Sequence, residues 1–190
     1  MILILTGDGK GKTTAALGQA MRALGNDERV LIIQFIKGPF KSGEDFFAEK
    51  FQVRACRQAG SNTKFQIIKG GLGFVGILGD KHSLTEHKKA AEETWESAKI
   101  KILSGLPGQG RWDLVILDEI NNAMHLKLLS EKEVLDFLAD IKSRKLKMDI
   151  ILTGRDASPS LIEIADLVTE MKEIKHPYQK GEGARKGIEF

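Results

Sequence analysis

The sequence predicts an α/β fold with a mostly parallel sheet flanked by helices. Short runs of Ile, Leu and Val alternate along the chain with longer segments of helical periodicity, which is typical of parallel strands joined by helices. Within the runs, apolar and polar residues do not alternate, so these strands are expected to be covered on both faces. The length of 190 residues, 42% of them hydrophobic, fits one domain with a substantial core.

Four strands and four helices are expected in alternation. The strands are the apolar runs at residues 2–5, 30–35, 114–117 and 150–152. The first helix is expected from about residue 12 to 24, where Gly25 ends it. The other three helices begin at residues that commonly cap helices: Ser83 with Glu86, Ser130 with Glu133, and Ser158 before Pro159.

The composition excludes several classes of protein. The net charge is only +3 and the basic residues are spread along the chain, so no nucleic acid is expected as a partner. The apolar runs have the length of strands and are too short to span a membrane. One cysteine, Cys56, cannot form a disulfide within the chain, which favours a reducing, cytoplasmic compartment.

The histidines and tryptophans are assigned no chemical role. The spacing of the four histidines matches no common zinc-binding pattern. We expect all four at the surface or in loops: His82, His87, His125 and His176. Trp95 and Trp112 are expected to pack in the core, and residues 105–110, with three glycines and a proline, are expected to form a loop.

The strongest motif, TGDGKGKTT at residues 6–14, follows the first strand directly and leads into the first helix. Glycines let backbone N–H groups turn toward an anion, and the helix N-terminus adds partial positive charge. The general pattern G-x-x-x-x-G-K-[ST] would place a glycine at Thr6, one residue earlier than this sequence has it. We expect a P-loop that binds the triphosphate of ATP through Gly7, Asp8, Gly9, Lys10, Gly11, Lys12, Thr13 and Thr14.

Two further motifs follow later strands. Asp118 and Glu119 come after the run at residues 114–117, and a carboxylate at this end of a strand commonly holds Mg²⁺ beside a P-loop. We expect Thr13 to complete the magnesium site, and the sequence leaves open which of the two acids contacts the metal. Arg155 follows the run at residues 150–152; it is a candidate to bind phosphate or ribose oxygens, and a surface ion pair is an equal alternative.

Taken together, these motifs resemble the P-loop type of ATP:corrinoid adenosyltransferases, which adenosylate cobalamin and its precursors. The resemblance covers nearly the whole chain and includes the shortened glycine loop. It is carried by separated segments in the same order: residues 6–16, 34–38, 117–119, 153–155, 165–171, 175–177 and 187–190.

The resemblance implies a RecA-like, P-loop NTPase-like domain over residues 1–190, with a polar tail at residues 175–190. It implies that ATP binds with its triphosphate reversed relative to ordinary NTPases. A corrinoid reduced to Co(I) then attacks the 5′-carbon of ATP, and triphosphate leaves. It also implies a homodimer with Mg²⁺, and it leaves room for an electron-donor protein, such as a flavodoxin-like reductant, as a partner.

For the catalytic residues, the resemblance points to Lys12 and Phe74. The family favours reduction to Co(I) by displacing the lower cobalt ligand with bulky apolar side chains, and Phe74 matches one of them. Phe74 lies in a segment with five glycines, residues 70–79, which we call the glycine-rich loop. A tryptophan of the best-known members is replaced near Gly76, and the candidates to substitute for it are Val75, Ile77 and Leu78. Core packing of Phe74 is the alternative.

Three other functions compete with adenosyl transfer. A RecA-like ATPase would use Glu119 as the acid that activates water, and a nucleoside kinase would need an acceptor-site base that the sequence does not identify. A regulator that binds ATP or corrinoid without turnover would use the glycine-rich loop as a partner surface. The phosphate product formed with and without reduced corrinoid separates these functions.

Overall fold

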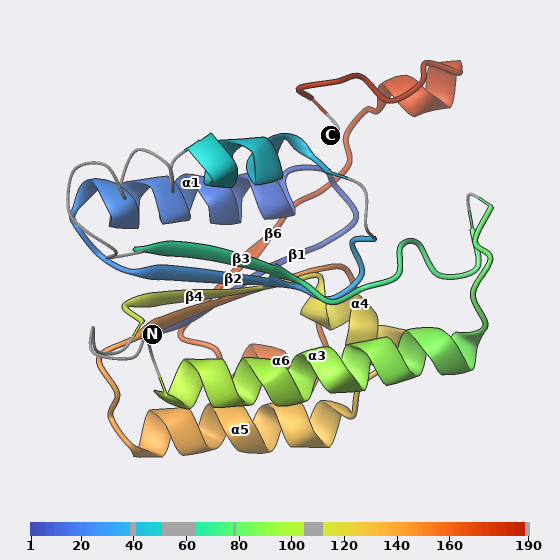
Figure 1. Ribbon diagram of the computed structural model, residues 1–190. Helices are drawn as coiled ribbons and strands as arrows, with labels where there is room; N and C mark the ends of the chain where they lie inside the picture. The colour runs from blue at the N-terminus through green and yellow to red at the C-terminus, as the bar shows by residue number, and fades with distance from the viewer. Residues whose placement is uncertain (39–40, 51–63, 78, 105–111, 189–190) are drawn as a thin grey trace.

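A computed structural model describes residues 1–38, 41–50, 64–77, 79–104 and 112–188. In these residues six strands form one sheet in the order β3-β2-β4-β5-β1-β6, and all neighbouring strands are parallel (Figure 1). The strands are β1 Ile2–Thr6, β2 Val30–Gln34, β3 Phe65–Lys69, β4 Leu114–Asp118, β5 Asp149–Thr153 and β6 Leu167–Glu170. The predicted fold class is confirmed. Cys56, Leu78 and the loop predicted at residues 105–110 lie outside the described residues.

The sequence predicts the four central strands but not the two outer ones. β3 and β6 each have only one neighbouring strand. β3 has one fully buried residue and β6 has none, so neither needs the continuous apolar run of a central strand. The continuous apolar run that predicts the central strands is therefore weak in the edge strands β3 and β6.

The predicted helices are all present: α1 Lys12–Gly25, α3 Leu84–Ser104, α5 Glu131–Ser143 and α6 Pro159–Ile164. Their caps form as expected. Glu86 N–H donates to Ser83 Oγ at 3.2 Å, and Ser130 and Ser158 accept the same kind of bond from Glu133 and Leu161. Residues 43–50 are also helical, and two short elements were not predicted: α4 Ile120–His125 and the 3₁₀ helix Pro177–Lys180.

The helices cover both faces of the sheet (Figure 1). Alternate residues of β1 enter different cores: Leu3 and Leu5 pack with α1, whereas Ile2 and Ile4 pack with α3 and α5. Because both faces are buried, each central strand needs apolar residues at every position, which explains the continuous runs in the sequence.

The tryptophans and histidines test the remaining expectations. Trp95 and Trp112 are fully buried, as predicted. The prediction that every histidine lies at the surface or in a loop is wrong for His87. The side chain of His87 is only 3% exposed on α3, where its Nε2 atom is 2.9 Å from an oxygen of Asp80. A buried imidazole is tolerated here because a carboxylate partners it.

Candidate nucleotide-binding site

The glycine loop between β1 and α1 packs closely on the segment that follows β6. Gly9 N–H donates to the carbonyl of Met171 at 2.7 Å. A Cβ added at Gly9 would lie 2.7 Å from the carbonyl carbon of Lys172, and one at Gly7 would lie 2.5 Å from the Met171 oxygen. Gly7 and Gly11 also have positive φ angles of 95° and 114°. The loop therefore needs glycine both for its turns and for its close packing.

Two glycine-to-alanine substitutions are expected to have opposite effects on stability. Gly9→Ala should lower the free energy of unfolding by about 1–3 kcal/mol, since the new methyl group forces the backbone at Lys172 to move. Gly18→Ala, in the interior of α1 where a Cβ meets nothing within 4 Å, should raise it by about 0.5–1 kcal/mol. Urea unfolding of both variants measures this difference. Equal stability of the two variants would contradict the packing that we assign to Gly9.

The ammonium of Lys12 lies inside this loop. Its Nζ donates to the carbonyls of Gly7 and, at 2.7 Å, of Gly9. Burial lowers the pKa of Lys12, and the positive charge of Arg155 lowers it further, while Glu119 and other nearby carboxylates oppose this shift. The Lys12 ammonium therefore lies within the glycine loop, and its contact with a phosphate stays a prediction.

Asp118, at the end of β4, is the centre of a buried hydrogen-bond network. Its Oδ1 accepts from the hydroxyl of Thr13 at 2.8 Å and from the hydroxyl of Thr153 at 2.7 Å. Its Oδ2 accepts from the side-chain amide of Gln34 at 3.1 Å, and the side chain is fully buried. The fold therefore brings Thr13, in the first turn of α1, into contact with Asp118. β5 lies between β4, which carries Asp118, and β1, which leads into the loop before α1.

Glu119 lies next to this network in a strained conformation. Its φ of 63° is in the left-handed region, where non-glycine residues are uncommon, and its N–H donates to Thr153 Oγ1 at 2.9 Å. Burial and the charge of Asp118 raise the pKa of Glu119, and the cations of Lys37, Lys12 and Arg155 partly offset this rise. The Glu119 carboxyl is therefore close to Lys12 and to Arg155, and the charge of Arg155 also acts on Lys12.

The donor set fits a magnesium ion that is shared with phosphate. Mg²⁺ prefers hard oxygen ligands and usually takes one or two carboxylates, with waters and substrate phosphates as its other ligands. Thr13 and Asp118 place a hydroxyl and a carboxylate together, and Glu119 adds a second carboxyl beside them. No group of three or more His, Cys, Asp or Glu side chains suited to a metal occurs among the described residues, so this site would depend on the nucleotide for further ligands.

Lys37, just beyond β2, was not singled out as a site residue. Its ammonium pairs with Glu44 of helical residues 43–50 and lies 3.8 Å from Asp118 Oδ2. Lys37 and Gln34 belong to a segment that carried the family resemblance, but the sequence suggested no role for either. Only the parallel pairing of β2 with β4 places them beside Asp118.

The other predicted residues differ in how closely they approach this centre. Arg155 is exposed, and its charge acts on Lys12 and Glu119. Lys10 is exposed and donates to the carbonyl of Ile188 in the C-terminal tail. Asp8 and Thr14 are exposed on the loop and on α1.

Phe74 lies on the glycine-rich loop, beyond the end of β3. The side chain of Phe74 is 57% exposed, so the alternative of core packing is wrong. Because β1 and β3 are strands of one parallel sheet, the loops that follow them leave the sheet at the same end (Figure 1).

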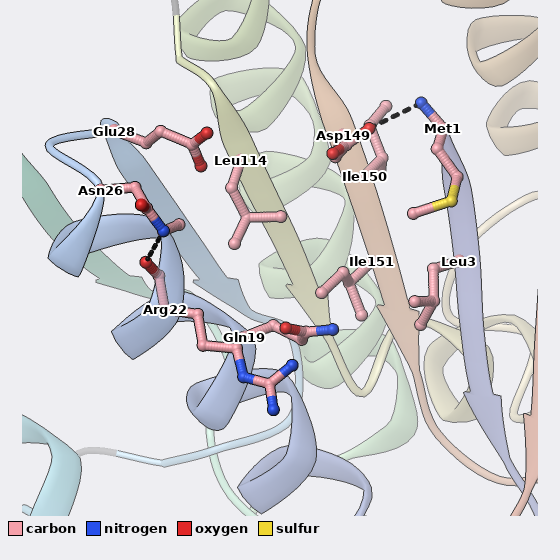
Figure 2. Close-up of a pocket in the computed structure, with 11 residues that line it drawn as sticks. Met1, Leu3, Gln19, Arg22, Asn26, Glu28, Leu114, Asp149, Ile150 and Ile151 are labelled. Carbon is pink, nitrogen blue, oxygen red and sulfur yellow. Dashed lines mark hydrogen bonds and ion pairs between the residues drawn. The ribbon is translucent and has the colours of Figure 1, made fainter.

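A separate pocket of about 170 Å³ lies at the other end of the strands, between the end of α1 and the starts of β1 and β5 (Figure 2). Two of the polar contacts that line it are internal: the Met1 ammonium pairs with Asp149 at 2.8 Å, and the Asn26 amide donates to the Arg22 carbonyl at 2.9 Å. This pocket contains none of the residues of the candidate nucleotide-binding site, and we assign it no role.

The all-parallel sheet and the glycine loop between β1 and α1 define an α/β protein of the P-loop type. The chain belongs to the ATP:corrinoid adenosyltransferase family, since the model of that family, BtuR/CobO/CobP, matches residues 1–190. It is 37% identical to a corrinoid adenosyltransferase of a Sinorhizobium species, covering 100% of this chain and 80% of that protein. It is 35% identical to a corrinoid adenosyltransferase of Pseudomonas aeruginosa, covering 100% and 83%.

Among solved structures, the chain is similar to the flagellar accessory protein FlaH of Methanocaldococcus jannaschii. The TM-score is 0.49 at 15% sequence identity, over 89% of this chain and 69% of that one. No helix in the described part of the chain is long and apolar enough to cross a membrane.

Proposed function

We propose that this protein transfers the 5′-deoxyadenosyl group of ATP to the Co(I) centre of a reduced corrinoid. In this reaction an electron pair of cobalt attacks the 5′-carbon, the carbon–oxygen bond breaks, and triphosphate leaves with the bonding electrons. The observation that carries the proposal is the family match over the whole chain. The reaction forms part of adenosylcobalamin biosynthesis or salvage.

The chemistry requires positioning and charge stabilisation more than a protein nucleophile, since cobalt itself attacks. The leaving triphosphate gains negative charge, and preorganised donors are the usual means of stabilising such charge. Lys12 and the N–H groups of the glycine loop would bind the triphosphate. The closeness of Lys12 to Arg155 and Glu119 supports one site for all three.

Thr13 and Asp118 would hold Mg²⁺, which when bound supplies positive charge to the triphosphate. Their contact at 2.8 Å supports Asp118 as the principal carboxylate. Glu119, whose pKa is raised, would act at the side of this site through its charge or a hydrogen bond. We therefore propose Asp118 rather than Glu119 as the main metal ligand, a choice that the sequence leaves open.

Phe74 would contact the corrinoid and help to displace the lower ligand of cobalt before reduction. Its exposure, together with that of Ile77, which is 58%, supports an apolar surface on the glycine-rich loop. Val75 packs against the core, so Ile77 is the better candidate to replace the missing tryptophan. An electron-donor protein, such as a flavodoxin-like reductant, would supply the electron.

We also propose a cytoplasmic homodimer. The single cysteine supports a reducing compartment. Exposed apolar side chains on β6, namely Leu167 and Val168, lie on a strand with one free edge among the described residues, and a second copy would cover them.

The reaction products test the proposed function. With ATP, Mg²⁺ and a chemically reduced corrinoid under anaerobic conditions, we expect triphosphate and an adenosylated corrinoid in equal amounts. Phosphorus NMR would detect the triphosphate, and the visible spectrum would detect the cobalt–carbon bond.

Controls without corrinoid separate this reaction from its rivals. ADP and phosphate formed without corrinoid would indicate a RecA-like ATPase, and ADP formed with a nucleoside would indicate a kinase. Neither rival is favoured by the family to which the chain belongs.

A further inference from the structure

Asp80 receives three hydrogen bonds at the point where the glycine-rich loop meets α3. Its Oδ2 accepts from the N–H of Gly76 at 2.8 Å and from His87 Nε2 at 2.9 Å. Its Oδ1 accepts from the N–H of His82 at 3.0 Å. The side chains of Asp80 and His87 are 8% and 3% exposed. Asp80 thus joins the loop to the first turn of α3.

The Asp80 carboxylate is ionised at neutral pH. The N–H groups of Gly76 and His82 bind the charged form and hold the pKa of Asp80 at about 2, with a smaller contribution from His87. An ionised carboxylate accepts hydrogen bonds and donates none, so His87 Nε2 carries the hydrogen in this contact. Hydrogen bonds of this kind, with a charged acceptor, are stronger than neutral ones.

The first part of the loop is fixed by close backbone packing. Gly70 N–H donates to the Gln34 carbonyl and Gly73 N–H to the Ile36 carbonyl, both at 3.0 Å. A Cβ added at Gly70 would lie 1.7 Å from Thr94 Oγ1 of α3. This half of the loop therefore rests on β2 and α3.

The exposed apolar side chains lie between these two anchored ends. Phe74 and Ile77 are more than half exposed, so burial does little to fix them in the free protein. Gly76, between them, has a φ of 70°, and a Cβ added at this position would meet nothing within 4 Å. Three contacts hold this part of the loop: the Gly76 N–H bond to the Asp80 carboxylate, the bond from the Asp80 N–H to the Ile77 carbonyl at 3.2 Å, and the packing of Val75 on the core. Loss of the Gly76 bond would loosen the turn, since glycine has the widest conformational freedom.

We propose that Asp80 and His87 form a clamp that holds residues 74–77 of the glycine-rich loop in the conformation that binds the corrinoid. Both are positioning residues, since neither needs to touch the substrate. His87 holds the carboxylate, and the carboxylate holds Gly76. The backbone at Gly76 sets the direction of Ile77, which follows it, and of Phe74, two residues before it. A loop that is ordered before binding loses less conformational entropy when the corrinoid binds. This inference rests on the proposed function of the loop.

The first test measures hydrogen exchange of the Gly76 amide in the free protein. His87→Leu removes the donor to Asp80 and keeps an apolar side chain in the buried site, and we expect Gly76 to exchange at least about tenfold faster. Asp80→Asn should do the same, because its amide nitrogen would meet one of the N–H groups that now donate to the two carboxylate oxygens. His87→Gln should restore slow exchange, since its amide nitrogen can replace Nε2 as the donor. Exchange of the Gly73 amide, which bonds Ile36, should change little and reports on general unfolding.

His82→Leu is the matched control, because it removes an imidazole five positions away. His82 contacts Asp80 through its backbone N–H, which the substitution keeps. Its side chain is 42% exposed, and its ring packs edge-on against His87 with the centroids 5.8 Å apart, an apolar contact that leucine can replace. We expect normal exchange at Gly76 in this variant. Unchanged exchange at Gly76 in both His87→Leu and Asp80→Asn would overturn the clamp.

The second test measures turnover. We expect His87→Leu to raise the KM for corrinoid about tenfold, equivalent to the loss of one hydrogen bond to a charged group, while the KM for ATP stays unchanged. The loss of activity in His87→Leu should be greater when cobalt enters as Co(II) than as Co(I). Phe74→Ala should show the same difference. His87→Gln should recover most of the activity that His87→Leu loses.

The outcomes separate the clamp from the proposed function. Faster exchange at Gly76 with an unchanged KM for corrinoid would overturn the positioning role. If the unmodified protein forms no adenosylated corrinoid, the proposed function has failed and the positioning role fails with it, whereas exchange at Gly76 still decides whether Asp80 and His87 hold the loop.

Discussion

Lys12→Ala should lower kcat/KM for ATP by about 10²–10³-fold, the usual cost of removing one donor that stabilises transition-state charge. In the free protein the Lys12 ammonium donates to two carbonyls of its own loop, so it is already held beside the place where phosphate would bind. The substitution removes the charge and leaves the glycine loop, whose shape is set by its packing on Met171 and Lys172. The loss should therefore appear in ATP binding and turnover, with the fold retained.

Calorimetric titration with ATP, steady-state kinetics and circular dichroism would measure these effects. Lys99→Ala is a suitable control, because Lys99 is a lysine of α3 that pairs with Glu96 at 2.7 Å and lies outside the site. It should bind ATP normally. ATP affinity and rate that remain unchanged in Lys12→Ala would refute the assignment of residues 7–13 as a triphosphate-binding loop.

Asp118→Asn should lower activity by at least about 10²-fold through loss of a metal ligand, since a neutral amide is a much poorer ligand for Mg²⁺ than a carboxylate. The fold should survive. The oxygen of the new amide can still accept from Thr13 and Thr153. The nitrogen of the new amide would face the side-chain amide nitrogen of Gln34. The carbonyl oxygen of Gln34 has no partner among the described atoms, so a rotation of the Gln34 amide would let that oxygen accept from the new nitrogen.

Binding of Mn²⁺ in the presence of ATP, followed by electron paramagnetic resonance, reports on the metal separately from turnover. Asp118→Asn should weaken Mn²⁺ binding strongly and Glu119→Gln only moderately, since Asp118 contacts Thr13. Thr13→Ala should also weaken it. A reversed order, with Glu119→Gln the more severe change, would make Glu119 the principal ligand and refute our choice of Asp118.

Three features could be read from the sequence because they depend on residues close together in the chain. The parallel sheet follows from continuous apolar runs, and the P-loop follows from glycines before Lys12 and Thr13. Two helix starts follow from a serine cap with an acid three residues later, and a third from a serine before a proline. Each pattern reports a local conformation or the burial of a single element. The two edge strands are not predicted, because partly exposed strands lack a continuous apolar run.

The sequence alone thus determined the class of the protein, and its similarity to the adenosyltransferase family identified the chemistry to expect. Only the tertiary structure decided which carboxylate meets the P-loop: Thr13 bonds Asp118 across 105 positions in the chain. It also placed His87 in a buried contact with Asp80 and packed Gly9 on Lys172. These contacts depend on strand order and on helices that pack across the sheet. No local pattern encodes them, because each partner alone is compatible with many neighbours and the fold selects one.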